Sequence, residues 1–167
     1  MQRIAILGCS GSGKSTLARK LGAVLDLPVV HMDQHYFSPG WVEPGHDDWR
    51  ATVAALCAED RWVMDGNYSK THDIRLPRAD LIIFLDFPTW LCVWRVLKRY
   101  WNYKGQTRPD LAPGCTEKLD FQFLNYVLTF RRKRAPKIKN KLFQLDKSVR
   151  ILSHPTEMNK LLKEFSA

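Results

Sequence analysis

Residues 8–15 read Gly8-Cys9-Ser10-Gly11-Ser12-Gly13-Lys14-Ser15. This stretch follows an apolar run, residues 4–7, and precedes a helical pattern that begins at Lys14. A glycine-rich loop holds phosphate groups when a strand delivers it and a helix N-terminus receives the anion. Both neighbours are present here, so the stretch predicts a phosphate-binding loop for a nucleoside triphosphate.

The residue types within this loop each meet a physical need. Glycine permits backbone conformations that let successive N–H groups converge on phosphate oxygens. Lys14 is expected to contact the β- and γ-phosphates, and the Ser15 hydroxyl to reach Mg²⁺. A simple Gly/Ser-rich turn would explain the glycines, but not a Lys-Ser pair in the first helical turn. The residues predicted to bind the nucleotide are Gly8, Ser10, Gly11, Ser12, Gly13, Lys14, Ser15 and Thr16.

Length and composition describe an ordinary globular chain. It has 167 residues and a net charge of +9, and 45% of its residues are hydrophobic. The basic balance indicates polyanionic partners, among them nucleotides, nucleic acid or a membrane surface. Its four cysteines are scattered, which argues against a zinc site or a disulfide framework. We see no signal peptide or membrane span, since Asp86 and Pro88 interrupt the most apolar stretch, and we expect a cytoplasmic location.

Apolar runs and helical patterns alternate along the chain. This alternation is typical of a parallel sheet covered by helices, so we predict a single α/β domain with three layers and five parallel strands. The strands are expected at residues 3–7, 29–32, 62–64, 81–85 and 148–152. The helices are expected at residues 14–25, 48–58, 89–101, 117–133 and 156–165, with Asp47 or Asp48 as a cap of the second and a restart near Pro136.

Three of the expected strands are followed by an aspartate, and two of these aspartates stand where a phosphotransferase would need one. The run Val63-Met64-Asp65 has the Walker B pattern, so Asp65 is predicted to hold Mg²⁺ together with Ser15. Asp33 follows the second strand and is predicted to orient an acceptor hydroxyl or to take its proton. The alternative is that these aspartates merely begin turns or cap helices. Asp86 ends the fourth strand and favours such a structural role.

Two arginines, Arg95 and Arg99, lie four residues apart on one expected helix. At that spacing their guanidinium groups share a helix face and can grip phosphate oxygens. A solvated face is an equally good interpretation from spacing alone. Trp90, Val93, Trp94 and Leu97 are expected to form the buried stripe of this helix.

With these motifs together, the chain resembles the nucleoside monophosphate kinase group of P-loop proteins. It is most similar to adenylate-kinase-related proteins known as topology modulation proteins, and the resemblance covers nearly the whole chain. The segments that carry it are Gly8–Ser15, Met32-Asp33, Pro39-Gly40-Trp41, Trp62–Tyr68, Arg75, Ala79-Asp80, Phe84–Pro88, Arg108-Pro109-Asp110 and Pro113-Gly114-Cys115.

The resemblance implies an ATP- and Mg²⁺-dependent phosphotransferase with a short acceptor arm, about residues 33–60, and a short lid, about residues 102–116. Arg95 would lie near the adenine and Arg99 near the phosphates, as in adenylate kinases. The implied catalytic residues are Lys14, Asp33, Arg95 and Arg99. The implied residues at the acceptor side are Asp33, Arg50, Asp65 and Arg75.

The chain also departs from the adenylate kinase pattern. After Asp65-Gly66 it continues Asn67-Tyr68-Ser69, where adenylate kinases have Phe-Pro-Arg with an arginine that grips the acceptor phosphate. The basic groups expected along the helix that returns from the lid come later, at Arg131 to Arg134. These departures argue against AMP and favour a different small molecule with a hydroxyl or phosphate group.

The sequence leaves more than one function open. A kinase that transfers the γ-phosphoryl group of ATP to a small-molecule acceptor fits best. A nucleic-acid-associated P-loop ATPase would also suit the basic charge, although the chain has no helix-turn-helix, zinc-finger or RNA-binding aromatic signature. A nucleotide-binding regulator with negligible turnover is the third alternative.

Overall fold

The computed structural model describes residues 1–166 and has one parallel sheet of five strands in the order β2-β3-β1-β4-β5. The strands are β1 (Arg3–Gly8), β2 (Val29–His31), β3 (Trp62–Asp65), β4 (Leu81–Leu85) and β5 (Ser148–Leu152). The glycine-rich loop therefore leaves the central strand, with β3 and β4 pairing on either side of it. The predicted fold class is confirmed.

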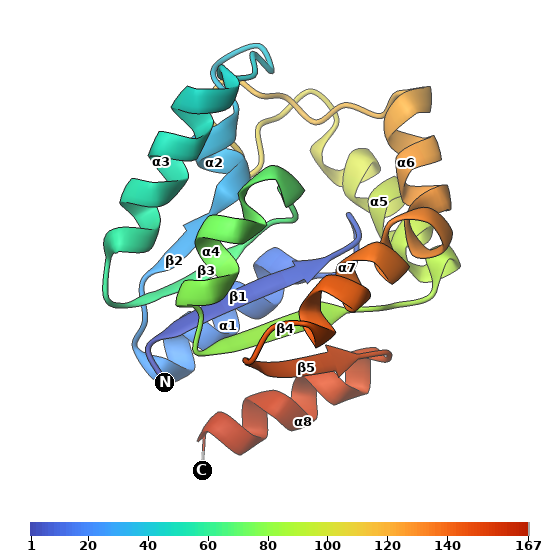
Figure 1. Ribbon diagram of the computed structural model, residues 1–167. Helices are drawn as coiled ribbons and strands as arrows, with labels where there is room; N and C mark the ends of the chain where they lie inside the picture. The colour runs from blue at the N-terminus through green and yellow to red at the C-terminus, as the bar shows by residue number, and fades with distance from the viewer. Residues whose placement is uncertain (167) are drawn as a thin grey trace.

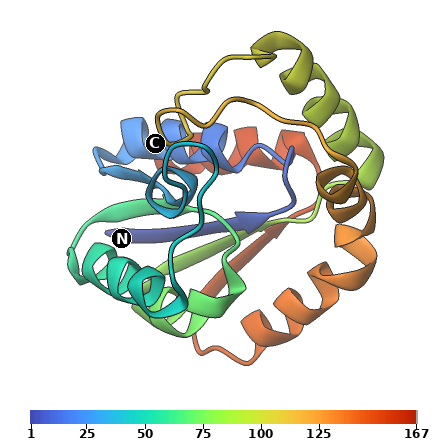
Figure 2. The same cartoon turned by 90° about the horizontal axis from the view of Figure 1, so that it is seen from above.

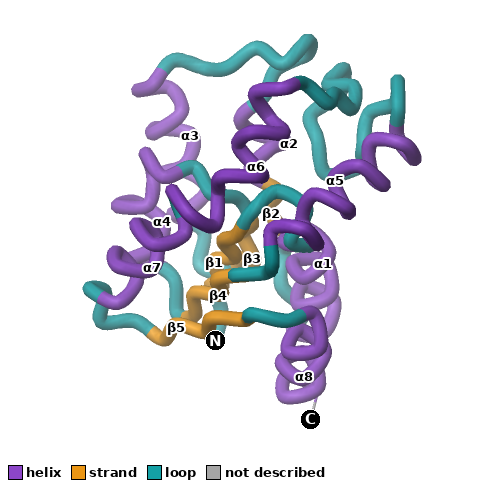
Figure 3. Tube along the Cα trace, turned by 90° about the vertical axis from the view of Figure 1, so that its right-hand side faces the viewer, coloured by secondary structure: helices purple, strands orange, loops and turns teal. Residues whose placement is uncertain are grey.

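Helices cover both faces of this sheet, which gives three layers. Figure 3 shows α1 and α8 on one side of the strands and α3, α4 and α7 on the other. In Figure 1, α5 and α6 stand together beyond one end of the strands. The helices are α1 (Lys14–Leu25), α2 (Met32–Tyr36), α3 (His46–Ala58), α4 (His72–Arg78), α5 (Thr89–Tyr103), α6 (Phe121–Lys133), α7 (Ala135–Phe143) and α8 (Pro155–Ser166), with a 3₁₀ turn η1 (Ser69–Thr71).

The hydrophobic core lies on both faces of the central strands. Residues 4–7 of β1 and all of β4 are buried, because each face of these strands packs against helices. Strands covered on both faces are continuous apolar runs rather than alternating ones. Within residues 1–166, no helix is both long enough and apolar enough to cross a membrane.

The observed elements differ from the sequence prediction at several ends. Strand β2 stops at His31, since Met32 and Asp33 already belong to the short helix α2. Helix α6 begins at Phe121, where the Asp120 side chain accepts a hydrogen bond from the backbone N–H of Phe123 at 2.7 Å. Helix α4 was not predicted, because Pro77 lies inside it and it has only seven residues.

Two predictions about individual helices are wrong. Helix α3 has Gly45 at its N-cap, so Asp47 and Asp48 lie in the first turn and supply no cap. On α5, Trp90 and Trp94 face solvent, together with Leu97. The buried residues of α5 are instead the smaller Cys92 and Val96.

The segment that joins α5 to α6, residues 104–120, reaches across to the loop between α2 and α3 (Figure 2). The Trp41 indole donates a hydrogen bond to the Thr116 carbonyl at 3.0 Å, and the Gln34 amide donates to the Pro109 carbonyl at 2.6 Å. A small apolar cluster seals this contact: Leu111, Ala112 and Cys115 against Phe37 and Trp41. The segment thereby roofs the carboxyl ends of the strands.

Candidate active site

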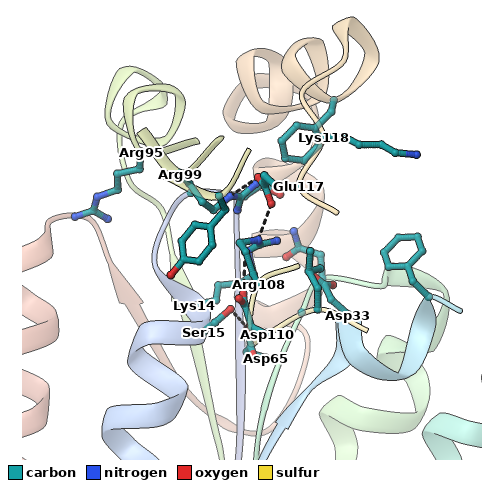
Figure 4. A pocket seen from close by; sticks show the side chains of 18 of the residues that line it. Lys14, Ser15, Asp33, Asp65, Arg95, Arg99, Arg108, Asp110, Glu117 and Lys118 are labelled. Atoms are coloured by element: carbon teal, nitrogen blue, oxygen red, sulfur yellow. Dashed lines mark hydrogen bonds and ion pairs between the residues drawn. The ribbon is translucent and has the colours of Figure 1, made fainter. Parts of the chain in front are cut away.

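A cavity of about 1030 Å³ lies at the carboxyl ends of the strands. Its floor is the glycine-rich loop with the first turn of α1, one wall is α2 with residues 65–68, and its roof is the segment 104–120. Figure 4 shows side chains from these elements converging on one space. Open parallel sheets bind their ligands at this edge.

The glycine-rich loop is held in shape by its neighbours. Gly11 has φ +81°, and a Cβ built there would lie 2.3 Å from the Cys92 carbonyl of α5, so only glycine fits. Asn67 accepts a hydrogen bond from the Gly8 N–H at 3.0 Å and donates one to the Gly8 carbonyl at 2.7 Å. The loop is therefore fixed from both sides before any ligand arrives.

Two cations border the loop. The Lys14 ammonium donates a hydrogen bond to the Cys9 carbonyl at 3.0 Å, which folds its side chain back over the loop. The Arg95 guanidinium donates to the Ser12 carbonyl at 3.1 Å. In Figure 4, Arg95 lies apart from the other labelled groups, at the opposite side of the loop from Asp33. The two cations thus flank the anion site rather than sharing one position.

A hydroxyl and a carboxylate meet beside Lys14. The Ser15 hydroxyl donates to Asp65 Oδ2 at 2.9 Å, and Asp110 from the roof lies next to them (Figure 4). Hydroxyl and carboxylate oxygens are the hard ligands that Mg²⁺ takes, typically one or two from protein with the rest from water and phosphate. The donor set of Ser15 and Asp65 fits Mg²⁺.

His31 supports the second oxygen of this carboxylate. Its Nδ1 lies 2.5 Å from Asp65 Oδ1, and both side chains are nearly buried. Burial alone would lower the pKa of His31, but the hydrogen bond and the negative charge of Asp65 outweigh it and raise that pKa above its ordinary value. The imidazole therefore orients Asp65 and leaves Oδ2 directed at Ser15.

Asp33 lies across the cavity from the loop (Figure 4). The Tyr68 hydroxyl donates a hydrogen bond to Asp33 Oδ1 at 2.6 Å, which leaves Oδ2 free to face a ligand. Desolvation raises the pKa of Asp33 above its ordinary value, although the Tyr68 hydrogen bond and the positive charge of Lys14 act against it. A carboxylate of raised pKa is a better proton acceptor.

The roof contributes a cluster of four charges. Arg99 of α5 donates to Glu117 Oε1 at 2.7 Å, and Arg108 forms an ion pair with Glu117 Oε2 at 2.6 Å. Arg108 also donates to Asp110 Oδ2 at 2.9 Å. Burial would raise the pKa of Asp110, but the charge of Arg108 holds it below the ordinary value. Two cations are thus preassembled above the loop, each balanced by a carboxylate.

Most of the residues that the sequence suggested come together in this cavity. Those that line it are Ser10, Gly11, Gly13, Lys14, Ser15, Thr16, Asp33, Asp65, Arg95 and Arg99. Gly8 and Ser12 belong to the same loop but do not line the cavity. The roles of all these residues stay proposals.

Arg50 and Arg75 do not reach the cavity. Arg50 of α3 is held against α4 and η1, where it pairs with Asp73 at 2.6 Å and donates to the Lys70 carbonyl. Arg75 is fully buried and donates to the carbonyls of Gly66 and Asn67 at 3.0 and 2.5 Å. Desolvation lowers the pKa of Arg75 to about 10. The structure gives both arginines structural contacts in place of the expected acceptor contacts.

We predict that Arg75→Ala destabilises the fold. The Gly66 carbonyl would lose the Arg75 donor and the Asn67 carbonyl would keep only His72 Nε2, and each unsatisfied buried group costs about 1–3 kcal/mol. Chemical denaturation should show a free energy of unfolding lower by about 3 kcal/mol, with Arg78→Ala, an exposed change on the same helix, as the control. If Arg75→Ala instead had unchanged stability and a raised KM for an acceptor, Arg75 would have the acceptor-binding role that the resemblance implies.

The arginines at positions 131–134 also lie outside the cavity. They occupy the C-terminal end of α6, where Arg131 is 3.4 Å from Asp86 and Arg134 stands over the Tyr126 ring at 4.6 Å. Lys139 of α7 also pairs with Asp86. Asp86 therefore has the structural role that its position indicated.

Several residues at the site had no predicted role. Arg108 and Asp110 were part of a recognised motif, but only the folded chain shows that this motif reaches back over the loop. Tyr68 ended a segment that carries the resemblance and marked a departure from the adenylate kinase pattern, but it had no predicted role of its own. The unpredicted lining residues with a polar group are Arg19, Glu43, Asn67, Tyr68, Tyr103, Arg108, Asp110, Glu117, Lys118, Asp120, Gln122 and Tyr126.

The side of the cavity formed by α2 and the loop after it is lined by aromatic rings. Phe37, Trp41 and Tyr68 border the cavity, and Tyr36 and Trp49 support them from behind. Ring centroids of neighbouring pairs lie 4.7–5.0 Å apart in edge-on or tilted geometry. Such packing makes a stiff apolar wall opposite the charged roof.

No protein-family model and no curated protein matches the chain, but solved structures resemble it over almost its full length. A gluconokinase from Sinorhizobium meliloti 1021 is 17% identical, covering 98% of this chain and 89% of that one, with a TM-score of 0.56. A shikimate kinase from Acinetobacter baumannii, in complex with shikimate, is 16% identical over 98% and 90%, with a TM-score of 0.58. A deoxyadenosine kinase from M. mycoides is 14% identical over 96% of each chain, with a TM-score of 0.56. The chain has the P-loop kinase fold.

Proposed function

We propose that the protein is a Mg²⁺-ATP-dependent kinase that phosphorylates a hydroxyl group of a small molecule. The observation that carries this proposal is the position of Asp33. Its carboxylate faces the same cavity as Lys14 and Ser15, on the far side of the phosphate site. A simple ATPase needs the loop and a water molecule, whereas a half-buried carboxylate beside an aromatic wall suits an organic acceptor.

Arg95 borders two cavities, which could hold the triphosphate and the base of a nucleotide. The triphosphate would lie along the loop, where N–H groups and Lys14 meet its oxygens. A second hollow of about 420 Å³ adjoins the loop and is lined by Arg95, Pro155, Met158 and Asn159, among others. We propose that this hollow receives the base, in line with the role that the resemblance to adenylate kinases implies for Arg95.

Ser15 and Asp65 would hold the magnesium ion, which would neutralise negative charge on the phosphates. The chain's own residues then complete the reaction. The oxygen of the acceptor hydroxyl bonds to the γ-phosphorus while the bond from that phosphorus to the leaving ADP oxygen breaks. Asp33 accepts the proton that the hydroxyl loses. Arg99 and Arg108 stabilise the charge that develops on the transferred group.

The acceptor is expected to be a hydroxyl-bearing compound rather than AMP. Arg50 and Arg75, the basic groups expected to grip an acceptor phosphate, are engaged elsewhere. The aromatic wall of Phe37, Trp41 and Tyr68 suits the apolar face of a sugar, a cyclic hydroxy acid or a nucleoside. The names of the similar structures, a gluconokinase, a shikimate kinase and a deoxyadenosine kinase, span these three chemistries. We keep the adenylate-kinase-related topology modulation proteins as the proposed subfamily.

A pooled screen tests this function directly. Purified protein is incubated with ATP, Mg²⁺ and pools of hydroxylated metabolites and nucleosides, and products heavier by one phosphoryl group are sought by mass spectrometry. We expect a product from at least one pool and its loss with Asp33→Asn. ATP consumption that yields only inorganic phosphate from every pool would contradict the proposal.

Tyr68 gives a pH-dependent prediction. The ionised Asp33 is the active base, so transfer falls as pH drops through the pKa of Asp33, and the Tyr68 hydrogen bond lowers that pKa against burial. Tyr68→Phe removes the bond and should move the acid limb of kcat/KM up by about 0.5–1 pH unit. The charges of Lys14, Asp65 and Arg108 act on Asp33 in both the wild type and Tyr68→Phe. Their effects on the pKa of Asp33 therefore cancel when the two proteins are compared. An unshifted limb would exclude Asp33 as the base.

We propose that the segment 104–120 acts as the lid expected at about residues 102–116; its bounds differ because α5 continues to Tyr103 and α6 begins only at Phe121. Its backbone has few regular hydrogen bonds, and it meets α2 through Gln34 and the loop between α2 and α3 through Trp41. Closure over ATP would exclude water and limit futile hydrolysis. Hydrogen exchange in residues 104–120 should be fast without ligand and slow down with an ATP analogue plus Mg²⁺, while β4 remains unchanged. Slow exchange that the analogue does not alter would show a rigid roof instead.

A further inference from the structure

Helix α5 exposes a stripe of large apolar side chains. Trp90, Trp94, Leu97 and Trp101 have relative exposures of 71%, 54%, 44% and 85%. At 100° per residue, these four positions fall within about 60° of one another on the helix surface. Single exposed apolar residues are ordinary, but a contiguous patch marks a surface that another molecule covers.

The opposite face of α5 explains why this stripe points outwards. That face carries the buried Cys92 and Val96, together with Arg95 and Arg99, which reach the cavity. Arg95 is fixed by the Ser12 carbonyl and Arg99 by Glu117. The helix cannot turn the stripe towards the core without removing these arginines from the cavity. Burial of the stripe would therefore require a second molecule.

The spacing of the stripe identifies the kind of partner. Intervals of 4, 3 and 4 residues between positions 90, 94, 97 and 101 are those of a coiled-coil seam. These intervals read the same in both directions. An antiparallel copy of α5 would therefore set Trp90 against Trp101 of the partner subunit and Trp94 against the partner's Leu97. We propose that the protein forms a two-fold symmetric homodimer through antiparallel pairing of α5.

The size of the stripe suits such a dimer. A buried aromatic side chain covers about 150–250 Å², so three tryptophans and a leucine offer roughly 600 Å² from each subunit. A stable interface buries about 800 Å² per partner, and the stripe alone supplies about three quarters of that area. The contact is isologous, because the same patch meets itself across the two-fold axis.

The charges near the stripe favour a second copy over an anionic membrane. Two lysines flank the stripe: Lys98, whose ammonium lies 5.2 Å from the Trp94 ring centroid, and Lys104 at the C-cap of α5. In the antiparallel pair, Lys98 lies level with the partner's Val93 rather than with a like charge. Helices that bind membrane surfaces have a polar face rich in Lys and Arg, whereas Arg95 and Arg99 here turn towards the cavity.

Sedimentation velocity over a range of protein concentrations tests the dimer. The wild type should have twice the mass of the 19.4 kDa chain, whereas Trp94→Glu and Trp101→Glu should sediment as monomers with unchanged helical circular dichroism. Phe143→Glu, on the exposed surface of α7, is the control and should stay dimeric. A wild type that remains monomeric well above micromolar concentrations, or glutamate variants that remain dimeric, would overturn the proposal.

Cysteine pairing tests the antiparallel direction. The four native cysteines are buried, so introduced ones dominate surface oxidation. A mixture of Trp90→Cys and Trp101→Cys proteins should form the mixed disulfide, and each variant alone should form little. Efficient pairing of Trp90→Cys with itself would indicate another arrangement and overturn this one. Binding of monomeric wild type to phosphatidylserine vesicles, lost in Trp94→Glu, would replace the dimer by a membrane contact.

Discussion

Lys14→Ala is expected to abolish measurable phosphoryl transfer and to weaken ATP binding strongly. The Lys14 ammonium is the cation of the loop that is expected to contact the β- and γ-phosphates. In the structure it donates a hydrogen bond to the Cys9 carbonyl at 3.0 Å. Loss of one group that stabilises transition-state charge costs about 10²–10³-fold in rate. Since Lys14 makes this single hydrogen bond to the protein, the fold should be unaffected.

Isothermal titration calorimetry with ATP and Mg²⁺ measures the binding effect of this change. Lys147→Ala, an exposed lysine before β5, serves as the matched control and should bind like the wild type. Melting curves of the three proteins should coincide. Equal ATP affinity in Lys14→Ala and the wild type would remove the glycine-rich loop from the nucleotide site.

Asp33→Asn and Asp65→Asn should fail in different ways. Asp65 contacts Ser15 at the expected metal position, so its amide variant should lower the affinity for Mg²⁺ by about 10–100-fold and slow every ATP-dependent reaction. Asp33 contacts Tyr68 on the acceptor side, so its amide variant should bind ATP and Mg²⁺ almost normally. Loss of a general base should cost Asp33→Asn about 10²–10⁴-fold in transfer.

Background ATP hydrolysis separates these roles before an acceptor is identified. Hydrolysis should fall in Asp65→Asn and change little in Asp33→Asn. Asparagine is nearly isosteric with aspartate, so both variants should fold. Their circular dichroism spectra should match that of the wild type. An equal loss of hydrolysis in both variants would make Asp33 a second metal-side residue and remove its role as the base.

The sequence predicted the sheet well because its signals are local. The strand before the glycine-rich loop, the loop and the helix after it are adjacent in sequence, and a continuous apolar run such as residues 81–85 has few alternatives to a buried strand. Asp65 was placed at the end of a strand for the same reason, because it is the acid that ends such a run. Elements with weak or contradictory patterns, such as α4 with its internal Pro77, were missed.

Residues whose roles depend on distant contacts were beyond a sequence argument. Arg75 looks like an acceptor ligand until its bonds to the Gly66 and Asn67 carbonyls are seen. Arg108 acquires its position from Glu117 and Asp110, which brings the roof over the loop. The apolar face of α5 was predicted to be buried, because a strongly apolar helix face normally packs against the core. In the structure this face is exposed.

The central claim is that this cavity transfers the γ-phosphoryl group of ATP to an organic hydroxyl. The most direct measurement uses ATP carrying ¹⁸O in its γ-phosphoryl group, together with the acceptor found in the screen, and follows the label by mass spectrometry. We expect the label in a phosphorylated acceptor from the wild type, and its loss in Asp33→Asn while background hydrolysis persists. Label found only in inorganic phosphate, equally in both proteins and increased by DNA, would contradict the kinase and establish a nucleic-acid-associated ATPase.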